Sequence, residues 1–428
     1  MNFPIQHTPA EAAFLTAGAL LATEGRRREA FERFMAMGLP HRRLEDWRWT
    51  DLRQRISGAY PPVLDRAPPA VGKAELERSP FFAQIRGRVV LVDGVYAPEL
   101  STLPASGAIE IRGIVDASDA VLGRTAAPDS DPIIAMNTAF MAGGIAIRIA
   151  PATTVEAPFE ILSIVTAAEP RTLASRIVIL VEQGASASIV ETHLGAEGAS
   201  YVNNPVTEVI LGPEARLDRV KLQRDGKEAI HLSNLQARLD RNAILRDCTV
   251  TMGGSTTRQQ GFIAFDGENA DAKLTGAYLL RGKQHCDTRL IVDHRVPRCT
   301  SREIFKCVLD EEARGIFQGK VIVQRGAQKT DGKQSSHGLL LSPAAEFDAK
   351  PELEIYADDV VCGHGATAGD LEEDFVFYLR SRGISLAEAR ALLVSAFAAE
   401  AFEDIPHDGL RDTLAELAKS WVHRGRAE

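Results

Sequence analysis

A small-residue turn that carries an alanine recurs through the middle of the chain at an almost constant spacing. The intervals between these alanines are 30, 28 and 27 residues and then 57, about twice 28, for Ala185, Ala215, Ala243, Ala270 and Ala327. Several short strands in each unit of this length are typical of a solenoid. In a parallel β-helix each coil stacks on the previous one, and small residues at the corners let the backbones approach. The repeat therefore favours a parallel β-helix over coincidence in an alanine-rich chain.

The stretch from about residue 130 to residue 362 is dominated by short runs of β-branched and apolar residues. Examples are 145–149, 177–181 and 206–211. No helix-length periodic segment separates these runs, which argues against alternating βαβ units. Further upstream, residues 88–96 have the pattern of a strand, an Asp-Gly turn and a second strand.

Both ends of the chain have helical patterns. Residues 1 to about 58 combine strong helix formers with apolar residues three and four apart. Near the other end, Leu371, Phe375 and Leu379 recur at every fourth position, and Gly383 is predicted to end that helix. Ser385 and Glu388 then form a capping box for the next helix.

The expected fold class is therefore mainly β, with three parts. We expect an N-terminal helical region with short strands over 1–130, a parallel β-helix core over 131–365 and a C-terminal helical domain over 366–428.

Composition narrows the function classes. The net charge of −9 leaves no basic field to hold a phosphate backbone, which argues against nucleic acid as a partner. The apolar stretch 12–22 is too short to span a bilayer, so no membrane partner is expected. Five cysteines are a sparse and odd set for a secreted protein, and the first residues contain no basic run. We expect a cytoplasmic protein with free thiols.

Familiar catalytic and cofactor motifs are missing from the sequence. It contains no phosphate-binding loop, no G-x-S-x-G elbow, no H-E-x-x-H helix and no dinucleotide fingerprint that would support a flavin. The cysteine spacings of 38, 13, 8 and 55 also exclude C-x-x-C pairs, so a four-cysteine zinc or iron–sulfur site is not encoded. Cys286, Cys299 and Cys307 are expected to be buried structural thiols, and the sequence assigns no role to Cys248.

One short motif does have the chemistry of a metal site. Cys362 and His364 are two residues apart, so an extended backbone would place both side chains on one face. Thiolate and imidazole are good ligands for soft or borderline metals. Two ligands do not complete a site, and the others would come from another coil or another chain. The alternative is that neither residue binds a metal: the thiol is buried and structural, and the histidine is a polar residue with ordinary hydrogen bonds.

Two polar stretches precede this motif. The acidic residues before it could supply hard oxygen ligands, although a solvated strand face is the simpler interpretation; they are Glu352, Glu354, Asp358 and Asp359. The segment 329–334 is predicted to be a solvated loop because five of its residues are polar or charged.

Several longer motifs give the chain a strong resemblance to the SufB/SufD family of the Suf iron–sulfur cluster assembly system, and within it to the SufD branch. A shorter chain and the residues after His364 favour that branch over a SufB-like paralogue, although Trp49 stands where tyrosine is usual. The motifs are Gly38-Leu39-Pro40 with Glu45-x-Trp47, Phe305-Lys306-x-Val308-Leu309-Asp310, Ala313-Arg314-Gly315-x-Phe317-x-Gly319-Lys320, Lys350-Pro351-Glu352-Leu353-Glu354-Ile355-Tyr356 and Cys362-x-His364-Gly365-Ala366-Thr367.

The resemblance implies a right-handed parallel β-helix between helical regions, and a scaffold subunit without catalytic activity of its own. It implies pairing with SufB through the β-helix and docking of the ATPase SufC on the C-terminal helices, so that no nucleotide site is needed in this chain. A transient iron–sulfur cluster or iron would lie at the SufB interface near Cys362 and His364, with His364 as the favoured ligand.

Three alternatives and one assembly question remain open at this point. The alternatives are the SufB-like paralogue, a β-helix carbohydrate-active enzyme, and a purely structural partner in which Cys362 is inert. A terminal coil of a β-helix also exposes unpaired backbone groups. We therefore expect the isolated chain to form a homodimer.

Overall fold

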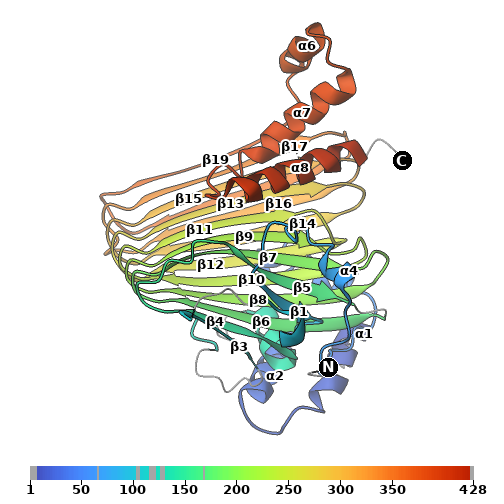
Figure 1. Ribbon diagram of the computed structural model, residues 1–428, viewed down its shortest axis with the longest axis vertical. Helices are drawn as coiled ribbons and strands as arrows, with labels where there is room; N and C mark the ends of the chain where they lie inside the picture. Colours follow the sequence, from blue (N-terminus) through green and yellow to red (C-terminus); the bar gives the residue numbers. More distant parts are fainter. Residues whose placement is uncertain are drawn as a thin grey trace, which may run out of the picture.

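Two parallel β-sheets face each other and form the walls of a long β-solenoid (Figure 1). The computed structural model describes residues 7–64, 67–102, 107–114, 122–125, 131–166 and 169–424. Within these residues one sheet has ten strands, in the order β19-β17-β15-β13-β11-β9-β7-β5-β1-β2. The other has nine, in the order β18-β16-β14-β12-β10-β8-β6-β4-β3. From β4 to β19 consecutive strands therefore alternate between the sheets, and the predicted solenoid is confirmed.

The strands of the stack are close to ten residues long for most of its length. Their bounds are β4 Gly143–Ile149, β5 Phe159–Val165, β6 Arg171–Val181, β7 Ser186–Gly195, β8 Tyr201–Leu211, β9 Arg216–Arg224, β10 Ile230–Leu239, β11 Ile244–Thr251, β12 Thr256–Phe265, β13 Asp271–Leu280, β14 His285–His294, β15 Thr300–Leu309, β16 Arg314–Val323, β17 Asp331–Leu340, β18 Glu346–Ile355 and β19 Val361–Gly369.

The alanine repeat corresponds to one corner of the coil. Ala243 and Ala270 are fully buried there, and each follows an asparagine with a positive φ. The gap of 57 residues in the repeat hides one further corner, where Cys299 takes the place of alanine and is fully buried. Strand register pairs Asp271 with Thr300 in the next coil, which sets Cys299 above Ala270. A small buried side chain, rather than alanine itself, is therefore the requirement at this corner.

Every second side chain of a strand points into the space between the two sheets and fills it. In β15 the side chains of Phe305, Cys307 and Leu309 point inward and belong to the main apolar core, which runs along the solenoid. The intervening residue Val308 points outward and packs against the C-terminal helices. The inner and outer faces of a strand can therefore be assigned from every second residue.

The N-terminal segment closes the first end of the solenoid. The predicted hairpin is confirmed: β1 (Arg88–Val92) and β2 (Val95–Tyr96) are antiparallel, and the turn between them has positive φ at Asp93 and Gly94. β1 extends the ten-stranded sheet, and β3 (Ile109–Gly113) adds antiparallel to β4 at the edge of the other sheet. These antiparallel strands cover the edges that parallel coils would otherwise expose.

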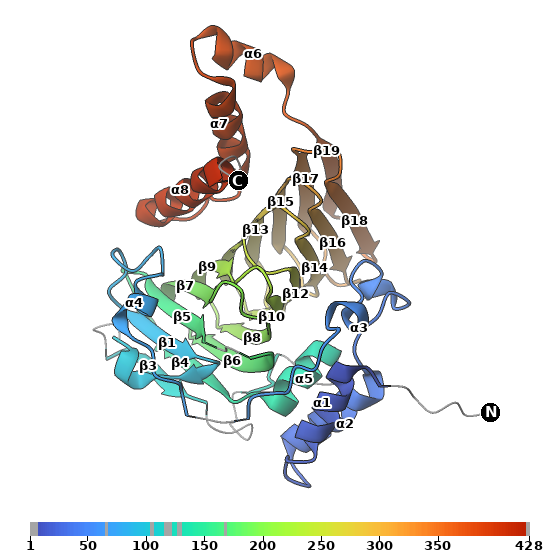
Figure 2. The ribbon, with the colours of Figure 1, turned by 90° about the vertical axis from the view of Figure 1, so that its right-hand side faces the viewer.

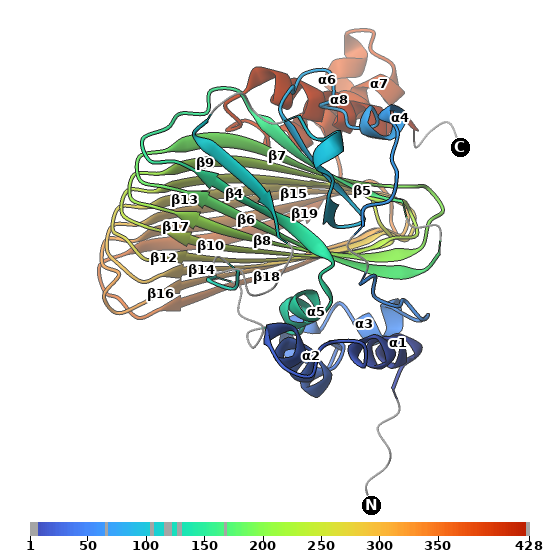
Figure 3. The same cartoon turned by 60° about the horizontal axis from the view of Figure 1, so that its bottom comes forward.

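Helices cover the outer face of each sheet. Figure 3 shows α1 (Pro9–Gly18), α2 (Arg26–Met37) and α5 (Pro132–Phe140) together on the side of the nine-stranded sheet. Shorter helical turns follow at η1 Glu45–Trp47, α3 Leu52–Arg55, α4 Lys73–Leu76 and η2 Pro98–Leu100.

The C-terminal helices lie on the ten-stranded sheet. They are α6 (Glu373–Ser381), α7 (Leu386–Ala399) and α8 (Asp408–Arg424). Outward residues of β13, β15 and β17 form an apolar cluster with α7 and α8, whereas α6 projects away from the stack (Figure 2). The predicted end of α6 and the N-cap of α7 are confirmed, because Gly383 has a φ of +87° and the Ser385 hydroxyl accepts a hydrogen bond from the Glu388 amide at 3.2 Å. Of the predicted capping box, this is the half that the structure shows. None of the helices in the described residues is long and apolar enough to cross a membrane.

A buried arginine attaches α5 to the nine-stranded sheet. The Arg176 guanidinium donates to Asn137 Oδ1 at 3.0 Å, to Thr138 Oγ1 at 2.6 Å and to Glu208 Oε1 at 3.0 Å. The side chains of Arg176 and Glu208 are almost completely buried. Removing one partner of such a pair leaves an uncompensated charge in a medium of low dielectric.

We therefore expect Arg176→Met to lower the free energy of unfolding by about 3–5 kcal/mol. The double variant Arg176→Met/Glu208→Gln removes both charges and should recover more than half of this loss. Urea unfolding followed by circular dichroism measures both. Equal losses in the single and double variants would contradict the argument from buried charge.

Candidate functional site

The last coil of the solenoid is left uncovered. β18 and β19 are the terminal strands of their sheets, so each has a parallel neighbour on one side only. No residue within either strand is fully buried, in contrast to the coils below them. Phe347 and Leu353 point into the solenoid from β18, yet they are only half-buried because no further coil lies above them.

β19 places Cys362 and His364 on one face, as the two-residue spacing predicts. Cys362 is paired with Gly332 and His364 with Gln334 in the adjacent strand β17. The thiol is half-buried and the imidazole is exposed. Both residues line one groove of about 440 Å³ at the open end of the solenoid, together with Glu303 and Gln334.

A ladder of polar side chains forms the floor of this groove. The register places Glu303 of β15 beside Gln334 of β17, and Gln334 beside His364 of β19. The expectation of a solvated loop over 329–334 is therefore wrong from Asp331 onward, because these residues begin β17. Gln334 is buried and reaches across the solenoid, where its Nε2 donates to the carbonyl oxygen of Gly319 at 3.3 Å.

Glu303 is the site residue that the sequence reasoning missed. Its side chain is 1% exposed, and neither carboxylate oxygen has a hydrogen-bond partner among the described residues. The Ser301 hydroxyl lies 3.1 Å from His294 Nε2 and is near enough to Glu303 to act against the rise in the pKa of its carboxyl. Burial raises the pKa of Glu303 to about 8. Alternation with Phe305 and the core residues after it could have revealed a carboxyl on an inward-facing position.

The Cys362 thiol is held in its neutral form in the chain alone. Burial raises its pKa above the usual value, and the nearby carboxyl groups of Asp331 and Glu303 add to that shift. A bound metal ion would have to displace the thiol proton. Within the described part of the chain no three His, Cys, Asp or Glu side chains are grouped closely enough to hold a metal ion. Other ligands would thus be needed to complete a site built on this thiol.

The other four cysteines are buried in the body of the solenoid, as predicted for Cys286, Cys299 and Cys307, and none is in a disulfide. Burial raises the pKa of the Cys248 thiol to about 12 and that of Cys299 to about 11. His285 and Cys286 point to opposite faces of β14: Cys286 lies in the core, and His285 Nε2 lies 2.9 Å from Thr50 Oγ1. These thiols have the environment of structural cysteines.

The acidic run before Cys362 lies largely on the outer face and forms ion pairs. Glu352 pairs with Lys350 at 3.2 Å and Glu354 with Lys320 at 2.6 Å. This agrees with the simpler interpretation of a solvated strand face.

Comparison with known proteins identifies the family. A model described as the SufBD core domain of the SUF system for FeS cluster assembly matches residues 164–397, and a model of the SufBD N-terminal region matches residues 8–161. The chain belongs to the SufBD family. It is 30% identical over 415 residues to an iron–sulfur cluster assembly SufBD family protein of Synechocystis, covering 91% of this chain and 89% of that protein.

Another relative carries the name predicted from the motifs. The iron–sulfur cluster assembly protein SufD of Escherichia coli is 27% identical over 404 residues, covering 92% of this chain and 93% of SufD. The resemblance to SufD is thus confirmed, and iron–sulfur cluster assembly replaces the carbohydrate-active alternative.

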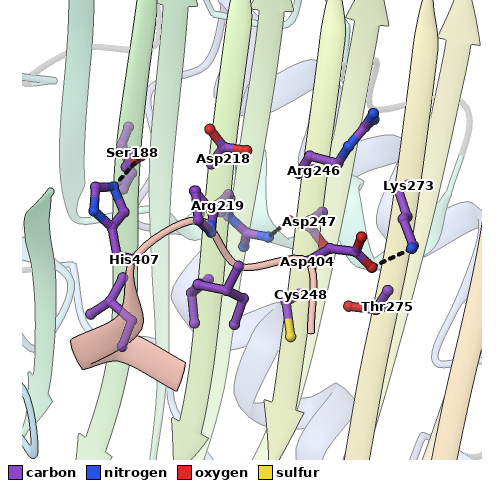
Figure 4. Close-up of a pocket in the computed structure, with 15 residues that line it drawn as sticks. Ser188, Asp218, Arg219, Arg246, Asp247, Cys248, Lys273, Thr275, Asp404 and His407 are labelled. Atoms are coloured by element: carbon purple, nitrogen blue, oxygen red, sulfur yellow. Dashed lines mark hydrogen bonds and ion pairs between the residues drawn. The ribbon is translucent and has the colours of Figure 1, made fainter. Parts of the chain in front are cut away.

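In this SufBD chain, the segment between α7 and α8 is fixed to the outer face of the ten-stranded sheet. Figure 4 shows Asp404 paired with Lys273, and the His407 Nε2 lying 2.9 Å from Ser188 Oγ. The hydroxyl of Thr275 also donates to the carbonyl oxygen of Ala401 at 2.8 Å. The small, mostly apolar space beneath this segment belongs to the packing of the C-terminal region on the solenoid.

The α6 helix of the SufBD chain presents an unpartnered aromatic surface. Phe377 is 74% exposed, Phe375 and Tyr378 are more than half exposed, and no residue of α6 is buried. A groove beside Phe377 is lined by residues of α6 and α7, including Leu386 and several acidic and basic side chains. Clustered exposed aromatics of this kind are typical of protein-binding surfaces.

The Glu303 carboxyl should make stability depend on pH. Its pKa is about 8 in the folded chain and 4.5 as the reference for an unfolded one, so the unfolded state loses this proton first as pH rises. The folded state is therefore destabilised between about pH 5 and pH 8, by at most about 1.4 kcal/mol per pH unit.

We expect Glu303→Gln to remove this component, so that the variant gains stability over the native chain as pH increases from 5 to 8. Urea unfolding at several pH values measures the difference. A constant difference between the two proteins across this range would show that the carboxyl does not titrate there.

Proposed function

We propose that this chain is a SufD-type scaffold subunit without catalytic activity, which pairs with SufB and docks SufC during iron–sulfur cluster assembly. The observation that carries the proposal is the position of Cys362 and His364 in one groove of an uncovered terminal coil. Imidazole and thiolate suit iron and sulfide, so the groove provides part of a coordination sphere.

The incomplete ligand set supports a shared and transient site. Two ligands from one chain cannot saturate an iron centre, so the facing subunit has to contribute the others. His364 is exposed and available as a ligand, whereas the thiol of Cys362 is half-buried and protonated. We assign His364 the leading role and Cys362 a supporting one. A cluster held in this way can be released more easily than one held by four thiolates of a single chain.

The terminal coil supplies the surface for SufB. Its backbone edge is free, and its apolar side chains are only half-buried, so a second β-helix would complete both the sheets and the core. A second copy of this chain meets the same requirement, and we propose a homodimer when SufB is absent. We place this assembly in the cytoplasm, consistent with free thiols.

The α6 helix supplies the surface for SufC. Docking an ATPase there would cover the exposed aromatic side chains, and the nucleotide would then be handled by the partner. Truncation after Gly369 is a poor test, because α7 and α8 also cover outward apolar residues of the ten-stranded sheet.

His364→Ala should abolish or sharply reduce cluster maturation in cells that depend on this system, because the exposed imidazole is the principal ligand of the groove. Cys362→Ser should have a smaller effect. Enzyme activities that require iron–sulfur clusters report maturation, and co-purification reports whether SufB and SufC still bind. Normal maturation with His364→Ala would show that this histidine is only a polar residue on a terminal strand.

Phe377→Asp should weaken SufC binding by at least about tenfold, because a charged side chain replaces a central aromatic contact. The fold should be unaffected, since Phe377 is exposed and makes no core contact. Surface plasmon resonance with purified SufC measures the affinity, and Leu20→Asp, at an exposed apolar residue after α1, is the matched control. Unchanged binding in Phe377→Asp would remove α6 from the docking surface.

A further inference from the structure

The floor of the groove contains polar oxygens that the chain itself leaves without partners. They are both carboxylate oxygens of Glu303 and Oε1 of Gln334; Oγ of Ser336, two residues further along β17 and outside the groove lining, also has no partner among the described residues. All three side chains are 3% exposed or less and extend from β15 or β17 into the solenoid. Buried polar groups are nearly always satisfied in folded proteins, so a cluster of unsatisfied oxygens calls for an occupant.

The nearest cation does not fill this role. Arg302 precedes Glu303 in β15, but its guanidinium bonds to the side chain and carbonyl oxygen of Asp331. Lys333 lines the rim of the groove and is exposed. Among the described residues Glu303 therefore has no ion-pair partner, and isolated buried carboxyl groups are costly.

The side-chain amide of Gln334 fits because the residue opposite it is Gly319. A Cβ built on Gly319 would lie 2.1 Å from Gln334 Oε1, so any larger residue at this position would displace the amide. The opposing sheet thus accommodates the amide by having a glycine where it crosses.

We propose that Glu303 and Gln334 form an oxygen-donor subsite for a divalent cation on the floor of the groove, directly below His364 and in the groove that Cys362 also lines. Carboxylate and amide oxygens are ligands for hard or hydrated divalent ions, which bind through oxygen. The cation supplies the missing positive charge, and its bound water can donate to the unpartnered oxygens.

The identity of the ion rests on the proposed function. In a cluster scaffold it would be ferrous iron, held by oxygen donors beside the softer sulfur and nitrogen ligands of β19. The subsite would then keep iron within reach of Cys362 and His364 before the facing subunit completes the coordination sphere.

Mn²⁺ is a suitable probe, because it prefers oxygen ligands and its free hydrated form is quantified by electron paramagnetic resonance. The purified full-length chain should bind one Mn²⁺, and Glu303→Gln should weaken this binding by about tenfold or more. Glu354→Gln makes the same chemical change on the outer face of the terminal coil and should bind Mn²⁺ as the native chain does. Absence of Mn²⁺ binding by the native chain, or equal affinity in Glu303→Gln, would overturn the proposal.

Two further variants guard against a folding defect. Glu303→Asp retains the carboxylate and Gln334→Met retains the volume without the oxygen, so each should lose part of the affinity while circular dichroism stays native. Native affinity in both would also overturn the proposal.

Co²⁺ separates this subsite from the Cys362 and His364 pair, because a cobalt–thiolate bond has its own absorption band. Cys362→Ser should lose that band and retain the Mn²⁺ site. If His364→Ala supports normal maturation while Glu303→Gln loses Mn²⁺, the proposed function fails and the subsite stands. If His364→Ala loses maturation while Glu303→Gln binds Mn²⁺ normally, the subsite is wrong and the proposed function stands.

Discussion

The structure depends on each coil being completed by the coils on either side of it. Backbone hydrogen bonds and inward side chains are satisfied only where a neighbouring coil is present, as in other solenoids. At the first end β1 extends one sheet, and the antiparallel strands β2 and β3 supply the cover at the sheet edges. At the other end, within the part of the chain that the structure describes, no further strand pairs with β18 or β19. The candidate site therefore lies in the coil that has no neighbour on one side.

Buried charge elsewhere in the solenoid shows why Glu303 is exceptional. In the middle coils Arg219 donates to Glu191 at 2.7 Å, and His231 lies 2.9 Å from Asp225 while accepting from Lys221 at 3.0 Å. Burial lowers the pKa of Lys221 to about 8, but each of these groups has a partner. Such networks are structural, because their members satisfy one another. Near the open end the buried carboxyl of Glu303 has no such partner among the described residues, which points to a function rather than to packing.

The sequence was sufficient for the fold class, the corner repeat, the hairpin at Asp93-Gly94 and the shared face of Cys362 and His364, because each follows from local periodicity or turn chemistry. It was misleading at Gln334, where a polar run was interpreted as a loop. Polar composition signals a loop only when strand interiors are apolar, and this solenoid carries a polar ladder inside. That Glu303 has no counter-ion among the described residues could not be predicted, since this depends on side chains brought together from coils about 30 residues apart.

The two proposed partner surfaces are directly connected through the chain. β19, which carries Cys362 and His364, ends at Gly369, and α6, which carries the exposed aromatics, begins at Glu373. Only residues 370–372 separate them, whereas α7 and α8 are fixed to the outer face of the ten-stranded sheet by Lys273–Asp404 and Lys306–Glu400 ion pairs. β19 pairs with a neighbour on one side only, so its other edge is free for a partner. A protein bound to α6 would therefore lie three residues along the chain from the strand that carries Cys362 and His364.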